Sequence, residues 1–287
     1  MKHSTQKHAF ICTVRQHVKR AAILAMSLVL LCFFLSGCNA LKSARPITDV
    51  HALDGQRVGV GLAWGPDYIL SQRDDVLVMR YNSVAGAVTA LRYRQVDAVA
   101  VEKPLAIEIV NSVPGLRYIE EPITQDSISV IVPPNQEELK QELNDFIAAF
   151  VQTPECQDLV ARLNDPNGYT PKQVPLPGGD RVLHVGAVAD AYPFSYFNTE
   201  TNSFEGTDIE FLCHFANACG YDLAFYDNTW ESMENGIQYG QYDIGCGGVS
   251  TAYRDDFELN DYARMTDPFL SVDIVFVVQD ESSQTKQ

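Results

Sequence analysis

Apolar stretches of strand length alternate with stretches of helical spacing along residues 51–127. Residues 56–63, 76–80 and 96–101 each predict a buried strand, because they are short, rich in Val and bounded by turn residues. Between the second and third, Asn82 or Ser83 can cap a helix that buries Val84, Val88 and Leu91 on one face. Strands that alternate with helices indicate an α/β fold with a mostly parallel sheet.

The same alternation returns in residues 181–278. Strands are expected over residues 182–187, 222–226 and 242–246. A helix is expected to begin at Thr207 or Asp208 and to end before Gly220, and a shorter helix to cover residues 231–239. Two stretches with the same order of elements predict two related α/β lobes.

A third pattern lies between these stretches. Residues 127–132 alternate and predict a strand, and helices are expected to begin near Asn135 and at Thr153-Pro154. Pro and Gly are frequent in residues 165–180, which indicates a linker. The expected organisation is therefore a lobe over 51–127, a hinge strand with two closing helices over 128–164, the linker, a lobe over 181–278 and a polar tail over 279–287.

The N-terminus has the pattern of an export signal. Residues 1–37 combine a basic lead without acidic residues, an apolar run from residue 21 to 35 and the small residues Ser36-Gly37 before Cys38. The run is short for a membrane span. This pattern resembles a lipoprotein signal, which would make Cys38 the acylated first residue and residues 38–50 a tether. The alternative is an ordinary signal peptide with an incidental cysteine.

Charge and cysteine content limit which partners and cofactors the chain is expected to bind. Residues 1–37 hold five of the 21 basic residues, so removing them leaves 16 basic against 37 acidic residues, a net charge of −21. Such a chain is a poor candidate for binding nucleic acid. Cys156, Cys213, Cys219 and Cys246 lack metal-ligand spacing, so we expect no metal site and no cofactor. Disulfides and buried free thiols both remain open for them.

One segment near the C-terminus has the residues of an anion-binding turn. Gly247 allows a close backbone approach, Thr251 offers a hydroxyl and an N–H, and Arg254 offers a planar fork that fits a carboxylate. A solvated surface position is the alternative for Arg254.

Several motifs resemble the solute-binding proteins of amino-acid ABC importers (family 3), which have a bilobed type II periplasmic-binding fold. In residues 181–278 the similar segments are the aromatic-proline loop of Tyr192 and Phe194, the helix start at Gly206-Thr207-Asp208, Trp230, Gly247 to Arg254, and Thr266-Asp267-Pro268-Phe269. These correspond to the family's first lobe. Residues 53–60 and Val96-Asp97-Ala98-Val99 resemble its second lobe.

The order of the two lobes is the reverse of that in a usual member. The chain therefore looks circularly permuted, with residues 165–180 joining the old termini. We then expect only residues 127–132 to cross covalently between the lobes, with residues 271–278 lying beside residues 56–60 at the hinge.

The resemblance implies how a solute would be held. Arg254 and Thr251, with Gly247 nearby, would take a carboxylate, and the aromatics Trp230, Tyr192 and Phe194 would cover the side chain. The family's first-lobe acid falls on Val188 and its stacking aromatic on Ala191. Asp190 or Glu102 would then be the ammonium partner, although Glu102 has a surface position as its alternative. Trp64 would either stack on the ligand or fill the cleft.

The resemblance favours a lipid-anchored, extracytoplasmic protein that delivers a small carboxylate-bearing solute to an ABC permease. An enzyme of the same fold, such as a cyclohexadienyl-type dehydratase, is the first alternative, and Glu102 is its candidate acid. A sensory module that does not transport is the second alternative.

Overall fold

The computed structural model describes residues 47, 50–51, 53–253 and 261–280. Cys38 and Arg254 lie outside these ranges, and so does the expected signal. Within the described ranges, no helix combines the length and the apolar character that a membrane crossing requires.

The first lobe along the chain, called the β1 lobe, is a small parallel α/β unit. Its elements are β1 (Gln56–Gly61), α2 (Gly65–Ser71), β2 (Val76–Tyr81), α3 (Val84–Arg92), β3 (Ala98–Glu102), α4 (Lys103–Ser112) and β4 (Leu116–Tyr118). β1 pairs in parallel with β2 and with β3. Ser83 caps α3 by accepting the N–H of Gly86 at 3.1 Å, as its position before the apolar stripe predicts.

The other lobe, called the β6 lobe, repeats this plan. Its elements are β6 (Arg181–Val188), β7 (Asp190–Ala191), β8 (Ser195–Asn198), β9 (Ser203–Glu205), α7 (Thr207–Cys219), β10 (Tyr221–Asn228), α8 (Trp230–Gln238), β11 (Ile244–Ser250), the 3₁₀ turn η2 (Thr251–Tyr253) and β12 (Arg264–Met265). β6 pairs in parallel with β10 and β11. The predicted α/β class is therefore confirmed in both lobes.

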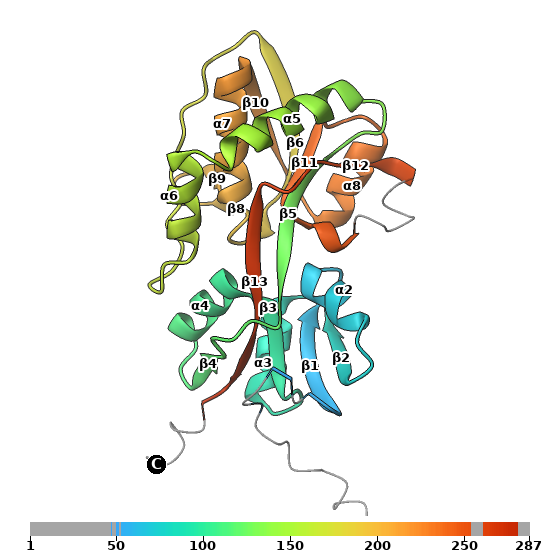
Figure 1. The fold of residues 1–287 in the computed structure, drawn as a ribbon, viewed down its shortest axis with the longest axis vertical. Coiled ribbons are helices and arrows are strands. Elements are labelled where there is room, and N and C mark those ends of the chain that lie inside the picture. The colour runs from blue at the N-terminus through green and yellow to red at the C-terminus, as the bar shows by residue number, and fades with distance from the viewer. Residues whose placement is uncertain (1–46, 48–49, 52, 254–260, 281–287) are drawn as a thin grey trace, which may run out of the picture. The chain divides into compact units, whose positions relative to one another are not determined.

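Two long strands join the lobes, β5 (Thr124–Val132) and β13 (Leu270–Gln279). They pair antiparallel with each other, from Leu270 opposite Ile128 to Ile274 opposite Thr124. Figure 1 shows them side by side, β5 in green and β13 in red. β5 continues into the sheet of the β6 lobe beside β11, and β13 continues into the sheet of the β1 lobe beside β3. Each lobe's sheet thus contains one strand that arrives from the other lobe.

The strand orders of the two lobes match position by position. The order is β2-β1-β3-β13 in one lobe and β10-β6-β11-β5 in the other, with the short strands β4 and β12 added on β13 and β5. This correspondence agrees with the two related lobes expected from the sequence. The exchanged order of the lobes relative to the family stays a prediction.

Two expectations about the crossing are wrong. β13 crosses between the lobes as well as β5, because Leu270 and Val272 pack in the core of the β6 lobe while Ile274 and Phe276 pack in that of the β1 lobe. β13 also lies beside β3, which separates it from β1. A ten-residue strand extends over about 33 Å, which is enough to contribute to both cores.

The helices α5 (Glu137–Phe150) and α6 (Pro154–Leu163) close the β6 lobe. Leu143, Ile147 and Phe150 share a core cluster with Phe211 and Phe215 of α7. The structure has no helix or strand between Leu163 and Arg181. Four cysteines are free thiols, which favours free thiols over disulfides: Cys156, Cys213, Cys219 and Cys246.

Candidate functional site

A cavity of about 370 Å³ lies between the two lobes. Its wall in the β1 lobe comes from the residues after β1 and β2 and from the end of β3, and its wall in the β6 lobe comes from the ends of β6, β10 and β11. These are the carboxyl ends of parallel strands, where open α/β sheets bind their ligands. The topology therefore puts the cavity where a solute site is expected.

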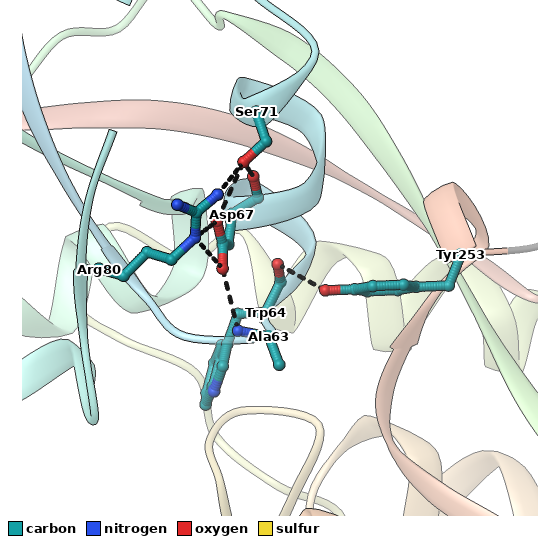
Figure 2. A network of polar contacts seen from close by, with 6 residues as sticks. All are labelled: Ala63, Trp64, Asp67, Ser71, Arg80 and Tyr253. Carbon is teal, nitrogen blue, oxygen red and sulfur yellow. Dashed lines mark hydrogen bonds and ion pairs between the residues drawn. The ribbon is translucent and has the colours of Figure 1, made fainter. Parts of the chain in front are cut away.

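The loop after β1 is held by side chains of α2 and β2, as Figure 2 shows. The N–H of Ala63, a residue with φ of 62°, donates to Asp67 Oδ2 at 3.2 Å. Arg80 Nε donates to Asp67 Oδ1 at 2.8 Å, and Arg80 Nη2 donates to Ser71 Oγ at 2.6 Å. Because this network fixes Ala63, it also fixes the direction in which the next residue, Trp64, enters the cavity wall.

A tyrosine of the β6 lobe reaches this loop. Tyr253 Oη donates to the carbonyl oxygen of Trp64 at 3.1 Å (Figure 2), and its ring centroid lies 4.8 Å from that of Tyr68. Two turns of different lobes, η2 and the start of α2, are therefore in contact at the edge of the cavity.

The Gly247-Gly248 turn lines the opposite wall, but its N–H groups are already bonded. Gly247 and Gly248 have φ of 149° and 75°, and their N–H groups donate to Asp208 Oδ2 at 3.0 and 2.9 Å. A Cβ on Gly248 would collide with the ring of Phe194, so glycine permits this close packing. Burial raises the pKa of Asp208 to about 6, against the lowering effect of these hydrogen bonds.

The start of α7 differs from the prediction. The N-cap is Gly206, with φ of 129°, and not Thr207 or Asp208. The side chain of Asp208 does not cap the helix, because its Oδ2 accepts both N–H groups of the glycine turn and its Oδ1 accepts from Thr207 Oγ1. The sequence pattern identifies the helix correctly, but it does not distinguish a cap from a longer-range partner.

Glu102 is the buried acid of the cavity wall. It is 3 % exposed, and its Oε2 has no hydrogen-bond partner among the described residues. Burial raises its pKa to about 7, the charge of Asp126 adds to the rise, and a backbone N–H opposes it. Its sequence neighbour Lys103 bonds instead to Glu120 at 3.2 Å. The surface alternative for Glu102 is therefore wrong.

A second acid, which the sequence analysis missed, lies close to this wall. Asp126 on β5 is 4 % exposed, and its Oδ1 accepts from Ser250 Oγ at 2.8 Å and from the Ser127 N–H at 2.7 Å. Its Oδ2 has no partner in the described part of the chain. A signal was present in the sequence, because Asp126 is in phase with Ile128 and Val130, whose side chains are buried.

The predicted ligand residues are brought together in part. The residues of that set that line the cavity are Trp64, Glu102, Asp190, Tyr192, Phe194, Trp230 and Gly247. Thr251 is not among the described residues of the wall, and Arg254 lies outside the described ranges. Phe194 is 1 % exposed and serves mainly as core. Ser250 and Tyr253 line the cavity but were not predicted, since a serine and a tyrosine next to the expected anion turn carry no signal of their own.

Comparisons with known proteins agree with the resemblance seen in the sequence. Residues 183–285 match the profile of the bacterial extracellular solute-binding proteins, family 3. The L-cystine-binding protein TcyA of Bacillus subtilis (strain 168) is 29% identical over 75 residues. This match covers 26% of the chain and 28% of that relative's length.

Solved structures with a similar arrangement include two from different classes. The probable amino-acid ABC transporter extracellular-binding protein ytmK of Bacillus subtilis has a TM-score of 0.43 at 11% identity, over 81% of this chain and 87% of that one. The reduced form of the regulatory domain of OxyR2 from Vibrio vulnificus has a TM-score of 0.39 at 14% identity, over 82% and 91%. Likenesses at this level do not choose between transport and regulation. The sequence resemblance to family 3 of the bacterial extracellular solute-binding proteins is confirmed, and residues 183–285 carry the match.

Proposed function

We propose that the chain is an extracytoplasmic solute-binding protein, anchored through a lipid on Cys38, that captures a small amino-acid-like solute for an ABC importer. The capture site is the cavity between the lobes, and closure of the lobes around the solute stabilises the bound state. The match of residues 183–285 to a solute-binding family supports this proposal.

The observation that carries the proposal is the buried carboxyl of Glu102 on the cavity wall. Its Oε2 lacks a partner within the described residues, and burying such a group is costly unless something pairs with it. An ammonium group of a bound solute is a suitable partner, because hydrogen bonds between charged groups are strong in a site shielded from water. We assign Glu102 this role.

The rest of the wall suits the body of such a solute. Trp64, Trp230 and Tyr192 are half-buried aromatic residues on the cavity, and they come from both lobes. Trp230 Nε1 donates to Glu234 Oε1 at 2.8 Å, which fixes the orientation of its ring. Carboxylate binding by Arg254 and Thr251 remains a prediction from the family resemblance.

Isothermal titration calorimetry with a panel of amino acids tests the proposal. We expect at least one amino acid to bind, and Glu102→Gln to weaken that binding by about a hundredfold. Arg254→Ala should weaken it as well if the predicted carboxylate contact exists. The proposal fails if no member of the panel binds, or if Glu102→Gln leaves the affinity unchanged.

An enzyme of the same fold is a second candidate, and one observation favours it. A carboxyl with a pKa of about 7 is well suited to take and return a proton near neutral pH. Incubation with cyclic amino-acid precursors tests this candidate. A dehydrated product that forms with the wild type and not with Glu102→Gln would favour catalysis over transport.

A further inference from the structure

The described wall of the cavity carries acidic groups without basic ones. Glu102 and Asp190 line it, and none of its described lining residues is Lys, Arg or His. Two cations in the described part of the β1 lobe are engaged elsewhere, since Lys103 pairs with Glu120 and Arg80 pairs with Asp67. A neutral zwitterion would leave this excess of negative charge only partly compensated.

Asp126 adds a further acid directly behind the wall. Gly65 and Ser250 both line the cavity, and Ser250 Oγ donates to Asp126 Oδ1 at 2.8 Å. A Cβ on Gly65 would collide with Asp126 Oδ2, so this position must remain glycine for the carboxylate to keep its place. The barrier between Asp126 and a solute is therefore formed by two of the smallest side chains.

The register of the sheet puts Asp126 and Glu102 on one face. Val272 of β13 lies opposite Asp126, and Ile274 lies opposite Glu102. Residues two apart on a strand share a face, so both carboxyls project to the same side across β13. Each has one buried oxygen without a partner in the described part of the chain. One ammonium group at Glu102 leaves the oxygen of Asp126 uncompensated.

We infer that the solute carries a second cationic group, which lies against the wall formed by Gly65 and Ser250 in front of Asp126. This inference rests on the proposed function, because Glu102 takes the amino group in it. The solute class is a basic amino acid or a related compound with two separated cationic groups. Asp126 is then the residue that distinguishes such solutes from neutral ones, because a buried charge interacts more strongly than an exposed one.

Calorimetry of the full chain at pH 8 with matched ligands tests the inference. Arginine and citrulline have nearly the same shape but differ in charge, and so do lysine and norleucine. We expect the cationic member of at least one pair to bind roughly ten- to a hundredfold tighter. Asp126→Asn should reduce this ratio to about threefold or less, while its amide oxygen can still accept from Ser250.

Asp273→Asn is the matched control. Asp273 lies on the partner strand opposite Gln125, which places it on the other face of the hinge from Asp126, and Gln125 Nε2 donates to it at 3.0 Å. The same loss of one charge should leave the ratio between the paired ligands unchanged there. The wild-type ratio requires no variant, so a poorly folded Asp126→Asn protein does not prevent the test.

The outcomes separate the two proposals. Equal affinity for the paired ligands, or a ratio that Asp126→Asn does not change, overturns the inference. If the paired ligands bind equally and Glu102→Gln abolishes the binding of both, the inference fails and the proposed function stands. If no member of either pair binds and the amino-acid panel also fails, both proposals are overturned.

Discussion

Two buried carboxyls, one in each lobe, are used in opposite ways: Glu102 lines the cavity, and Asp208 holds a turn that lines it. Asp208 of the β6 lobe is completely buried, and its Oδ2 accepts two backbone N–H groups from the Gly247-Gly248 turn. Glu102 of the β1 lobe is almost as buried, but its Oε2 has no partner within the described residues. The difference separates a carboxylate that holds a turn from one that is available to a ligand.

The comparison also bears on the anion-binding turn expected from the sequence. Gly247 allows a close backbone approach, as the sequence suggested. Its N–H, however, already donates to Asp208 of the same protein. A negatively charged solute group would have to compete with Asp208 there. Glu102, by contrast, attracts a positive group, so the described part of the cavity is better suited to an ammonium than to a carboxylate.

The largest expected effect comes from removing the structural carboxyl. Asp208→Ala removes the acceptor of the Gly247 and Gly248 N–H groups, so the free energy of unfolding should fall by about 3 kcal/mol. Denaturant titration measures this change. The exposed Asp227→Ala is the control and should change stability by less than about 0.5 kcal/mol. A loss below about 1 kcal/mol for Asp208→Ala would remove the distinction between the two acids.

Glu102→Gln should act in the opposite direction on stability. Since its folded pKa is about 7 and its ordinary value 4.5, the folded state holds this proton more tightly than the unfolded state. The free energy of unfolding therefore falls as pH rises from 4.5 to 7, by roughly 2 to 3 kcal/mol in total.

Without this ionisation, Glu102→Gln should be more stable than the wild type at pH 8 and nearly equal to it at pH 4. Thermal unfolding at both pH values measures the difference. A variant that is less stable at pH 8 would show that Glu102 already has a partner in the free protein.

The pH dependence of binding gives a smaller effect. A cationic solute group requires ionised Glu102, so the dissociation constant should rise as pH falls below 7, by up to about tenfold per pH unit, or about 1.4 kcal/mol. Calorimetry at pH 6.5 in buffers of different ionisation enthalpy should also detect release of a proton on binding. Binding that is independent of pH between 5 and 8 would argue against a contact with Glu102.

The contact between the lobes gives the smallest expected effect. Tyr253→Phe removes the hydrogen bond to the Trp64 carbonyl and keeps the ring that packs on Tyr68. A single neutral hydrogen bond contributes about 1 kcal/mol, so the dissociation constant should rise about fivefold. Tyr239→Phe, at a side chain 74% exposed, is the control and should bind like the wild type. A Tyr253→Phe affinity equal to that of the control would mean that this contact does not stabilise the closed lobes.

The sequence was sufficient for the parallel strands of both lobes and for the helices α3, α7 and α8, because their apolar residues recur at strand or helix spacing. It did not indicate α2, α4 or the short strands β4, β7, β8, β9 and β12. Ser83, Thr153 and Thr229 all cap the helices that follow them. The second crossing strand was missed because an apolar run does not show which core it enters. β13 enters two, so its first residues pack in one lobe and its last in the other.

The site was predicted less completely than the fold, because the sequence alone does not show which charged side chains are buried. Glu102 was found by family resemblance, and its burial could not be known before the packing of β3 against β13 was seen. Asp126 was missed, although a charged residue in phase with buried Ile128 and Val130 was visible in the sequence. A search for charges at buried strand positions would have found it.

The most direct test of a solute site built on Glu102 is calorimetric titration of the wild type and Glu102→Gln with the amino-acid panel at pH 8. A solute should bind the wild type, and Glu102→Gln should bind it about a hundredfold more weakly, although the variant is at least as stable. Equal affinity of the two proteins for every solute that binds would contradict a role of Glu102 in the site.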